Sequence, residues 1–517
     1  MTAVTGSRAT APRPTPRPKP DAVRARGRRR AMLALARVEA RRLLLHPLVL
    51  IALLAYLTLV LWPGAEPEDA YPVLQDIDRE TQTGQLLLGL AVLVAVNLAV
   101  LRSHRRGTEA SFSVLVLPPW RRTVAHVLSV LPTVLVGALI VAGQFTAAAL
   151  KPGAVGRGSV SELVTGPLLI LLPGAVGVLL ARVARSAFVA PLAVVAFLAF
   201  AMVFVADSTS PAWLRGLAPV VFDEGAWPLP SDLLGRPAAG HALYLLALAV
   251  LVTAGAVLLS GGRTRAVRAT ALGALGVTVL AVVLQGTAPS DAVRAAREVA
   301  TRDPAKVQDC ERHGTTTYCA FPEFTPWIDE WARVTDRVRA LAGAPDAERA
   351  LTVRQRVAAL DGPSGGTELA TTAAPGEVTA ITAWGGEREL EFAAGVARGL
   401  VVGHERYGGA YCDARGVLMV WLAVRATRDG EAAFERTGVD HNSPGVIQAP
   451  ATAIALRGRE LAVVQALFTR PRGEVERVVK ASWAELSAPG TTTDRAAALL
   501  GVTAPAETAD DREYQCA

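Results

Sequence analysis

The chain has 517 residues, of which 51% are hydrophobic, and a formal net charge of +7 at pH 7. Residues 1–286 hold 27 basic and 14 acidic residues, a net +13, whereas residues 287–517 hold 26 and 32, a net −6. A basic excess can indicate nucleic-acid binding, but no basic patch interleaved with aromatic residues accompanies it, so that class is excluded. The excess is typical of a cytoplasmic rim that faces anionic membrane lipids.

Residues 43–285 contain seven apolar segments that can cross a bilayer. A spanning helix needs roughly 20 mostly apolar residues, because lipid cannot satisfy exposed backbone amides. The segments are Leu43–Trp62, Leu86–Leu101, Val124–Leu150, Val164–Ala181, Ala187–Ala206, Ala242–Leu259 and Ala271–Gln285. Their charged and histidine side chains are limited to His46 and His126. Ion-coupled carriers use such groups inside the membrane, so the pattern predicts an integral membrane protein that is not a secondary transporter.

Basic residues alternate between the two sides of these segments. The N-terminal region and the even-numbered loops hold 22 Lys and Arg residues, whereas the intervening short loops hold five. Basic loops remain in the cytoplasm, so we expect a multi-pass cell-membrane protein with a cytoplasmic N-terminus. The predicted domains are a disordered basic tail (1–30), a six-span membrane domain (31–268), a seventh transmembrane helix (269–286) and an extracytoplasmic domain (287–517).

The number and positions of the cysteines agree with this topology. All four follow the last span: Cys310, Cys319, Cys412 and Cys516. An even number confined to one region indicates disulfides formed in an oxidising compartment. We favour Cys310–Cys319, in a hairpin with Gly314 at its tip, and Cys412–Cys516, although four cysteines allow three pairings. A zinc site is disfavoured because no C-x-x-C spacing is present.

Two elements border the membrane domain on the cytoplasmic side. The segment Ala31–Leu45 is predicted to form a basic amphipathic helix that lies along the cytoplasmic surface of the membrane. The loop at 102–123 contains the run Arg105, Arg106, Gly107, Thr108 and Glu109. Its sequence predicts a short helix from Thr108 to about Val116, ended by two prolines. Such a helix, carried on two transmembrane helices, offers a surface on which a partner can push.

These two elements carry a resemblance to a known family. The segment at 37–47, Arg-Val-Glu-Ala-Arg-Arg-Leu-Leu-Leu-His-Pro, resembles the entry of ABC-2-type transporter permeases. The loop residues 105–109, followed by Leu117-Pro118, are similar to the region that forms the coupling helix of those permeases. The resemblance covers about residues 31–268 and implies a homo- or heterodimeric permease driven by a separate ATP-binding subunit. The seventh span and the large exterior domain look like those of a group of actinobacterial permease-like proteins.

The chain has no phosphate-binding loop of the form G-x-x-x-x-G-K-[ST]. The run Leu259-Ser-Gly-Gly-Arg263 is superficially similar to the signature sequence of ABC ATPases. It follows a predicted span, however, and its glycines are better explained as the end of that helix. We therefore expect no cofactor and no enzyme activity in this chain, with ATP hydrolysis in the separate subunit.

The exterior domain is predicted to be mainly helical. Helices are expected at 290–301, 326–343, 346–360, 386–402, 413–427, 459–470, 474–487 and 493–500. Extended segments near 306–321 and 448–456 are expected to pair. Five tryptophans look like core anchors: Trp327, Trp331, Trp384, Trp421 and Trp483. The preceding apolar loop, Asp207–Gly240, is expected to rest in the outer membrane interface.

Catalytic or metal-binding chemistry is not evident in this domain. His404-Glu405 lacks the second histidine of a zinc-protease helix, and Asp440-His441 is accompanied by no nucleophile motif. His313 lies in the predicted hairpin. We interpret these histidines as surface or packing residues.

Three functions remain open at this point. The leading hypothesis is the membrane-spanning permease subunit of an ATP-driven ABC transporter, an exporter of a lipid-like or peptide substrate. The alternatives are a membrane-anchored extracytoplasmic enzyme and an envelope sensor or scaffold without transport.

Overall fold

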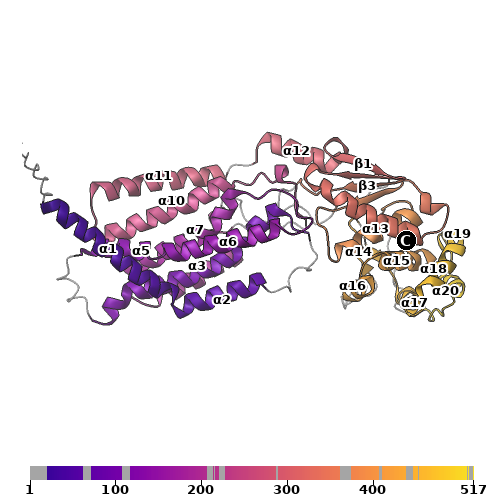
Figure 1. The fold of residues 1–517 in the computed structure, drawn as a ribbon, viewed down its shortest axis with the longest axis horizontal. Helices are drawn as coiled ribbons and strands as arrows, with labels where there is room; N and C mark the ends of the chain where they lie inside the picture. Colours follow the sequence, from indigo (N-terminus) through magenta and orange to yellow (C-terminus); the bar gives the residue numbers. More distant parts are fainter. Residues whose placement is uncertain are drawn as a thin grey trace, which may run out of the picture.

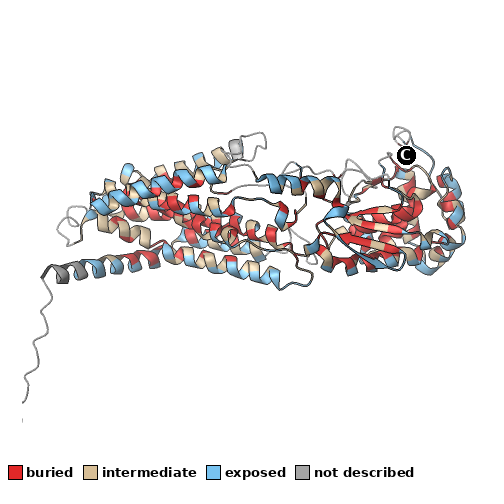
Figure 2. Ribbon diagram, turned by 90° about the horizontal axis from the view of Figure 1, so that it is seen from above, coloured by how far each residue is buried: buried red, intermediate tan, exposed pale blue. Residues whose placement is uncertain are grey.

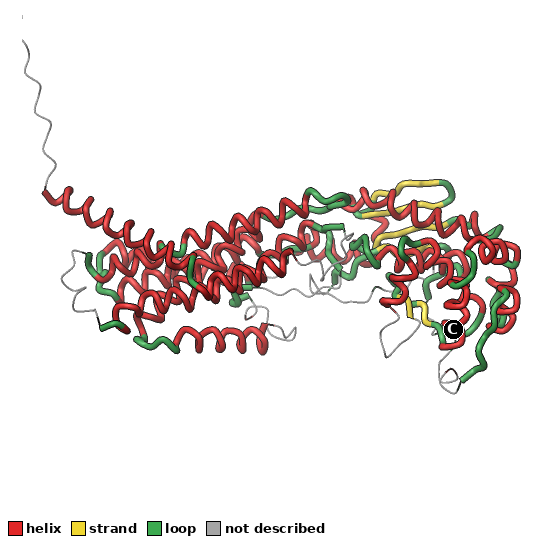
Figure 3. Tube along the Cα trace, turned by 60° about the horizontal axis from the view of Figure 1, so that its bottom comes forward, coloured by secondary structure: helices red, strands yellow, loops and turns green. Residues whose placement is uncertain are grey.

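The computed structural model has two lobes placed end to end (Figure 1). It describes residues 20–61, 71–107, 117–205, 214, 216–220, 227–286, 289–360, 369, 374–406, 410–437, 446–451, 453–508, 511 and 516. One lobe is a bundle of helices formed by residues up to 286. The other is the C-terminal domain, which contains strands β1 to β6 (Figure 3).

The bundle is built from helices, most of them apolar, with the basic helix α1 at its start. They are α1 (Pro20–Leu44), α2 (Pro47–Leu61), α3 (Leu74–Arg105), α5 (Pro119–Leu128), α6 (Leu131–Ala149), α7 (Val160–Val183), α8 (Val189–Phe200), α10 (Ala238–Leu259) and α11 (Arg265–Gln285). A π-helical turn, η1 (Ala201–Val205), continues α8. Arg102, Arg121 and Arg182, in the terminal turns of α3, α5 and α7, and Arg263, between α10 and α11, mark one end of the bundle, which we call the arginine-rich end. The opposite end meets the C-terminal domain and is called the domain end.

Within the described residues, five helices are long and apolar enough to cross a membrane. They are Leu74–Arg105, Pro119–Ala149, Val160–Val183, Ala238–Leu259 and Arg265–Gln285. The α1–α2 pair, bent by 55° at its break, is a sixth if it is counted as one span. The shorter apolar helix Val189–Val203 falls in the fifth predicted segment. The lobe is therefore that of a polytopic helical membrane protein with five or six candidate spans, where the sequence predicted seven.

Two helix boundaries differ from the prediction. α1 begins at Pro20, so residues 20–30, predicted to be disordered, are helical, and residues 1–19 lie outside the described part. α3 begins at Leu74 rather than Leu86. Residues 74–85 are too polar to resemble a span, but Gln75, Asp78 and Gln82 on this segment are buried against neighbouring elements.

α3 and α7 form the centre of the bundle. A Cβ atom at Gly89 would lie 2.0 Å from the carbonyl oxygen of Leu169, and one at Gly177 would lie 2.3 Å from that of Leu93. Glycine at these positions therefore permits the close approach of the two backbones. The outward faces of the surrounding helices expose apolar side chains such as Leu54 and Leu272, as expected for contact with lipid (Figure 2).

The C-terminal domain packs helices around a small sheet. Its α-helices are α12 (Asp291–Arg302), α13 (Ile328–Leu341), α14 (Arg388–Val401), α15 (Ala414–Ala426), α16 (Gly430–Thr437), α17 (Gly458–Phe468), α18 (Arg472–Ala481), α19 (Trp483–Leu486) and α20 (Thr493–Leu500). Short 3-10 turns occur at η2 (Ser231–Leu233), η3 (Pro304–Lys306), η4 (Pro322–Trp327) and η5 (Asp346–Glu348). The five tryptophans predicted as core anchors are all buried.

The sheet has the order β1-β2-β3-β4. Its strands are β1 (Asp309–His313), β2 (Thr316–Ala320), β3 (Leu351–Gln355) and β4 (Glu377–Ala380). β1 and β2 form an antiparallel hairpin, whereas β2, β3 and β4 run parallel to one another. A separate two-stranded ladder joins β5 (Val446–Ile447) to β6 (Ile454–Ala455).

The predicted helix at 346–360 is wrong. This segment forms η5 and then strand β3, in which Leu351, Val353 and Gln355 are buried and the residues between them are partly exposed. Alternation of buried and partly exposed residues with a period of two is the pattern of a strand. The sequence Leu-Thr-Val-Arg-Gln at 351–355 already showed an alternation of this kind. The segments near 306–321 and 448–456 do form strands, but each pairs within its own ladder and not with the other. β4 and α16 were not predicted, and 474–487 divides into α18 and α19.

Both favoured disulfides are present. Cys310 and Cys319 occupy directly opposed positions of the β1–β2 hairpin, with Cα atoms 4.1 Å apart. Gly314, with φ of +59°, forms the tip as predicted. Cys412 and Cys516, 104 residues apart in sequence, fasten the end of the described chain to the start of α15. These bonds indicate that the domain lies in an oxidising, extracytoplasmic compartment.

Candidate functional site

The arginine-rich end is organised around one carboxylate. Glu39 on α1 is only 6% exposed. Its two oxygens accept hydrogen bonds from Nη1 of Arg102, on α3, at 3.0 and 3.1 Å, and Oε1 also accepts one from Nη1 of Arg42 at 3.1 Å. A buried carboxylate needs such partners because its desolvation is costly. The ionic contact therefore fixes α1 across the end of α3.

The predicted coupling loop begins immediately after this contact. Arg105 is the last residue of α3, Arg106 caps the helix, and Gly107 has a φ of +65°. All three residues are exposed. Thr108, Glu109 and the rest of the expected short helix lie outside the described residues. The described part of the loop is therefore an accessible, doubly basic corner next to the α1–α3 contact.

The loop returns to the bundle at α5. Thr123 Oγ1 lies 2.7 Å from Oγ of Ser260, just after α10. Trp120 abuts Gly262, where an added Cβ would lie 3.0 Å from the Cβ of Trp120. α5 also packs extensively against α1. Both flanks of the 102–123 loop are thus joined to α1, one through the Glu39–Arg102 contact and the other through helix packing.

The domain-end half of α3 presents a buried polar face that the sequence analysis missed. Asp78 Oδ2 accepts a hydrogen bond from the backbone N–H of Ser159 at 2.7 Å. Gln82 Nε2 donates to Glu162 Oε2 on α7 at 2.8 Å, and Gln85 Nε2 donates to the Tyr56 hydroxyl on α2 at 2.9 Å. The spacing of these residues at 78, 82 and 85 puts them on one helical face. Buried carboxylates therefore occur in the membrane helices, beyond the predicted span boundaries.

Polar contacts between α3 and the C-terminal domain converge on Glu323. Gln75 Nε2 donates to Glu323 Oε1 at 3.1 Å and to the carbonyl oxygen of Leu229 at 3.0 Å. The backbone N–H of Ser231 donates to Oε1 at 2.7 Å and its hydroxyl to Oε2 at 2.8 Å. One carboxylate thus joins α3, the 227–237 loop and the C-terminal domain.

Apolar and aromatic contacts extend this junction. Val73, Val155, Leu229 and Leu233, from three separate bundle loops, belong to the hydrophobic core of the C-terminal domain. Trp327 Nε1–H donates to the carbonyl oxygen of Gly153 at 2.8 Å. The apolar loop residues at 229 and 233 therefore pack into the domain rather than against lipid, whereas most of the segment from 206 to 226 lies outside the described residues.

Tyr71 completes the junction just before α3. Its hydroxyl donates to Oε1 of Glu330 at 2.8 Å, and its backbone N–H donates to the carbonyl oxygen of Trp384 at 2.8 Å. Burial, followed by the hydrogen bond to Glu330, raises the pKa of Tyr71 to about 12. The phenol therefore remains a neutral hydrogen-bond donor to Glu330 at any physiological pH.

The histidine and carboxylate pairs noted in the sequence have structural partners or lie outside the described residues. Glu405 is 2% exposed and accepts hydrogen bonds from the backbone N–H and hydroxyl of Thr379, at 2.8 and 2.5 Å. Its neighbour His404 accepts one from the backbone N–H of Arg406. Asp440 and His441 are not among the described residues. Within the described chain, no group of three His, Cys, Asp or Glu side chains is arranged to hold a metal ion.

Neither a model of a protein family, nor a curated protein, nor a solved structure matches this chain.

Proposed function

We propose that the chain is the membrane-spanning permease subunit of an ATP-driven ABC exporter, working as a homo- or heterodimer with a separate ATP-binding subunit. In this proposal seven helices cross the cell membrane, the arginine-rich end is cytoplasmic and the C-terminal domain is extracytoplasmic. The distribution of arginine supports the orientation. The disulfides of the C-terminal domain support it independently, since they belong to an oxidising compartment.

The continuity of α3 is the observation that carries the proposal. The helix has 32 residues and is therefore about 48 Å long at 1.5 Å per residue. One end holds Arg102 and leads into the 102–123 loop. The other holds Gln75, which bonds to Glu323 and to the Leu229 carbonyl. A displacement of the loop would thus reach the C-terminal domain through a single rigid element.

The mechanism follows from these contacts. Closure of the ATP-binding subunits moves the 102–123 loop, and the loop displaces α3 and α5 together with α1, which is held by Glu39. Displacement of α3 shifts its buried polar face against α7 and tilts the C-terminal domain through Glu323 and Trp327. The domain then opens or closes the outer exit of the bundle for the substrate.

Purification of the tagged full-length protein from its native membrane in mild detergent tests the proposal. We expect a stoichiometric partner with a phosphate loop and an ABC signature sequence. The double variant Arg105→Glu/Arg106→Glu should lose this partner, because it reverses the charge of the exposed corner. Arg29→Glu/Arg30→Glu is the matched control, since it reverses two exposed arginines of α1 away from the loop.

Absence of an ATPase, while a known ABC complex survives the same detergent, would contradict the proposal. It would direct attention to the C-terminal domain as an enzyme or sensor. Equal loss of the partner in both double variants would contradict the role of the 102–123 loop and leave only a general charge effect.

A further inference from the structure

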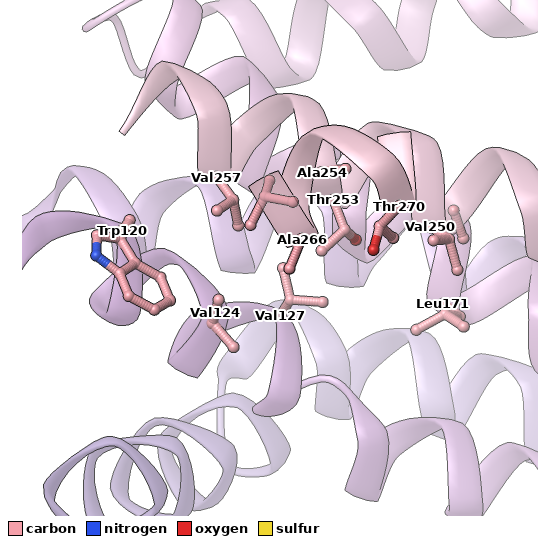
Figure 4. A pocket seen from close by; sticks show the side chains of 12 residues that line it. Trp120, Val124, Val127, Leu171, Val250, Thr253, Ala254, Val257, Ala266 and Thr270 are labelled. Atoms are coloured by element: carbon pink, nitrogen blue, oxygen red, sulfur yellow. The ribbon is translucent and has the colours of Figure 1, made fainter. Parts of the chain in front are cut away.

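A groove opens on the side of the bundle between α5, α7, α10 and α11. Its volume is about 360 Å³, within the range of small-molecule sites. Twelve side chains line it, and the only polar ones among them are Trp120, Thr253 and Thr270. Figure 4 shows the indole of Trp120 at one end of the groove, Leu171 and Val250 at the other, and the two threonines between them.

One arginine lies against Trp120 at this end of the groove, and three more are close in sequence to the lining residues. The guanidinium carbon of Arg121 lies 4.9 Å from the centre of the Trp120 ring. Arg263 directly follows Gly262, which contacts Trp120. Arg265 and Arg268 flank Ala266 and Val267, the lining residues in the first turn of α11. The side chains of Arg263, Arg265 and Arg268 are exposed. No Asp or Glu occurs anywhere in α5, α10 or α11. The groove therefore combines an apolar interior with a positively charged mouth.

We propose that this groove binds an anionic phospholipid of the adjacent leaflet. Guanidinium groups bind phosphate through several parallel hydrogen bonds, and basic pockets between transmembrane helices suit anionic headgroups. The acyl chain then lies along Val124, Val250 and Leu171, with Trp120 at the level of the headgroup. A neutral cargo would not require the arginines, and a soluble anion would not require the apolar interior.

The bound lipid bridges two parts of the molecule. α5 carries the return of the 102–123 loop, whereas α11 leads directly to α12 and the C-terminal domain. α11 packs mainly on α10, and the lipid adds a second contact, between α11 and α5. This site is independent of the proposed transport function, because it requires only that the arginine-rich end borders a lipid leaflet.

Native mass spectrometry of the delipidated full-length protein tests the charge requirement. The titrants are phosphatidylglycerol and phosphatidylcholine with identical acyl chains. We expect one phosphatidylglycerol to bind about tenfold or more tightly than phosphatidylcholine. Arg263→Gln/Arg265→Gln/Arg268→Gln should abolish this preference. The control Arg28→Gln/Arg29→Gln/Arg30→Gln removes three exposed arginines of α1 and should keep it.

A second pair of variants tests the groove itself. Ala266→Trp fills the groove from α11 and should weaken binding of both lipids, whereas Ala269→Trp, on an exposed part of the same helix outside the lining, should not. Thermal unfolding confirms that each variant is folded. Equal affinity for the two lipids, equal loss in both arginine triples, or unchanged binding in a folded Ala266→Trp protein would overturn the proposal.

Discussion

The two ends of α3 are held by different chemistry. At the arginine-rich end the contact is ionic, between Glu39 and Arg102, and the Arg102 side chain is 30% exposed. At the domain end, Gln75 forms hydrogen bonds beside Val73, which lies in the core of the C-terminal domain. Salt and water weaken partly exposed ionic contacts, whereas apolar burial is driven by water and is not weakened by charge screening. The domain end is therefore the firmer attachment and the arginine-rich end the adjustable one.

This difference suits a helix that is moved at one end. In the proposed mechanism, a partner that pushes on the 102–123 loop moves α3 together with α1, which is held to α3 by the weaker, ionic contact. In that mechanism the firm attachment carries the displacement to the C-terminal domain. Predictions for the two ends follow from the same contrast.

The largest effect is expected at the domain end for Trp327→Ala. Trp327 is fully buried, and truncation of a buried tryptophan costs about 3–5 kcal/mol. Limited proteolysis and chemical unfolding should show a destabilised, partly detached C-terminal domain. Trp327→Phe is the control, because it keeps an aromatic ring and loses the hydrogen bond to Gly153, worth about 1 kcal/mol, with only part of the packing that Trp327→Ala removes. Equal effects of the two substitutions would show that packing at Trp327 does not hold the domain.

A smaller, salt-dependent effect is expected at the arginine-rich end. Glu39→Gln should lower stability by about 1–3 kcal/mol, because it removes hydrogen bonds to a charged acceptor. The deficit should shrink in 1 M salt (a Debye length of about 3 Å), which screens the ionic contact in the unsubstituted protein. Thermal unfolding in lipid nanodiscs, at low salt and in 1 M salt, measures this loss of stability. In an Arg102→Gln background the same substitution should have little further effect, and full additivity would rule out the contact as the link between α1 and α3.

Tyr71→Phe should have a still smaller effect, about 0.5–1.5 kcal/mol, since it removes one hydrogen bond to Glu330 and keeps the ring. This loss should not depend on salt, in contrast to that of Glu39→Gln. A marked salt dependence would mean that the domain end also relies on charge.

Glu405 is a buried carboxylate whose oxygens accept hydrogen bonds from the backbone N–H and the hydroxyl of Thr379. Burial, the largest influence, raises the pKa of Glu405 above its ordinary value near 4.5. The folded state therefore binds a proton that the unfolded chain has released, so this contribution is fully present below pH 4.5 and is lost as the pH rises through the folded pKa. Glu405→Gln should flatten that part of the stability-against-pH curve. An unchanged slope would show that Glu405 is already ionised in the fold.

The sequence predicted the bundle well because hydropathy and arginine bias are local signals. Each predicted apolar segment is largely helical, although two of them cross a break between helices (α1–α2 and α5–α6) and five or six candidate spans replace the predicted seven. The polar start of α3 was missed, since Gln75, Asp78 and Gln82 become buried only through contacts with distant segments. Strand β3 was missed although its alternating pattern was present.

The candidate site was predicted only in part. Arg105, Arg106 and Gly107 are exposed at the expected end, whereas Thr108 and Glu109 lie outside the described residues. The role of Glu39 was not predicted, although a signal existed: it is the sole acidic residue between Asp21 and Glu66. Its partner Arg102 is 63 residues away, and no local pattern identifies such a pair. The disulfides were predicted because cysteine count and topology agreed.

Hydrogen–deuterium exchange of the complex purified with its ATPase, with and without ATP and vanadate, tests the central claim most directly. We predict that nucleotide changes exchange in two places at once, at residues 102–107 and at the domain-end segments 71–75 and 229–233. A change confined to residues 102–107 in the unsubstituted protein would contradict transmission through α3.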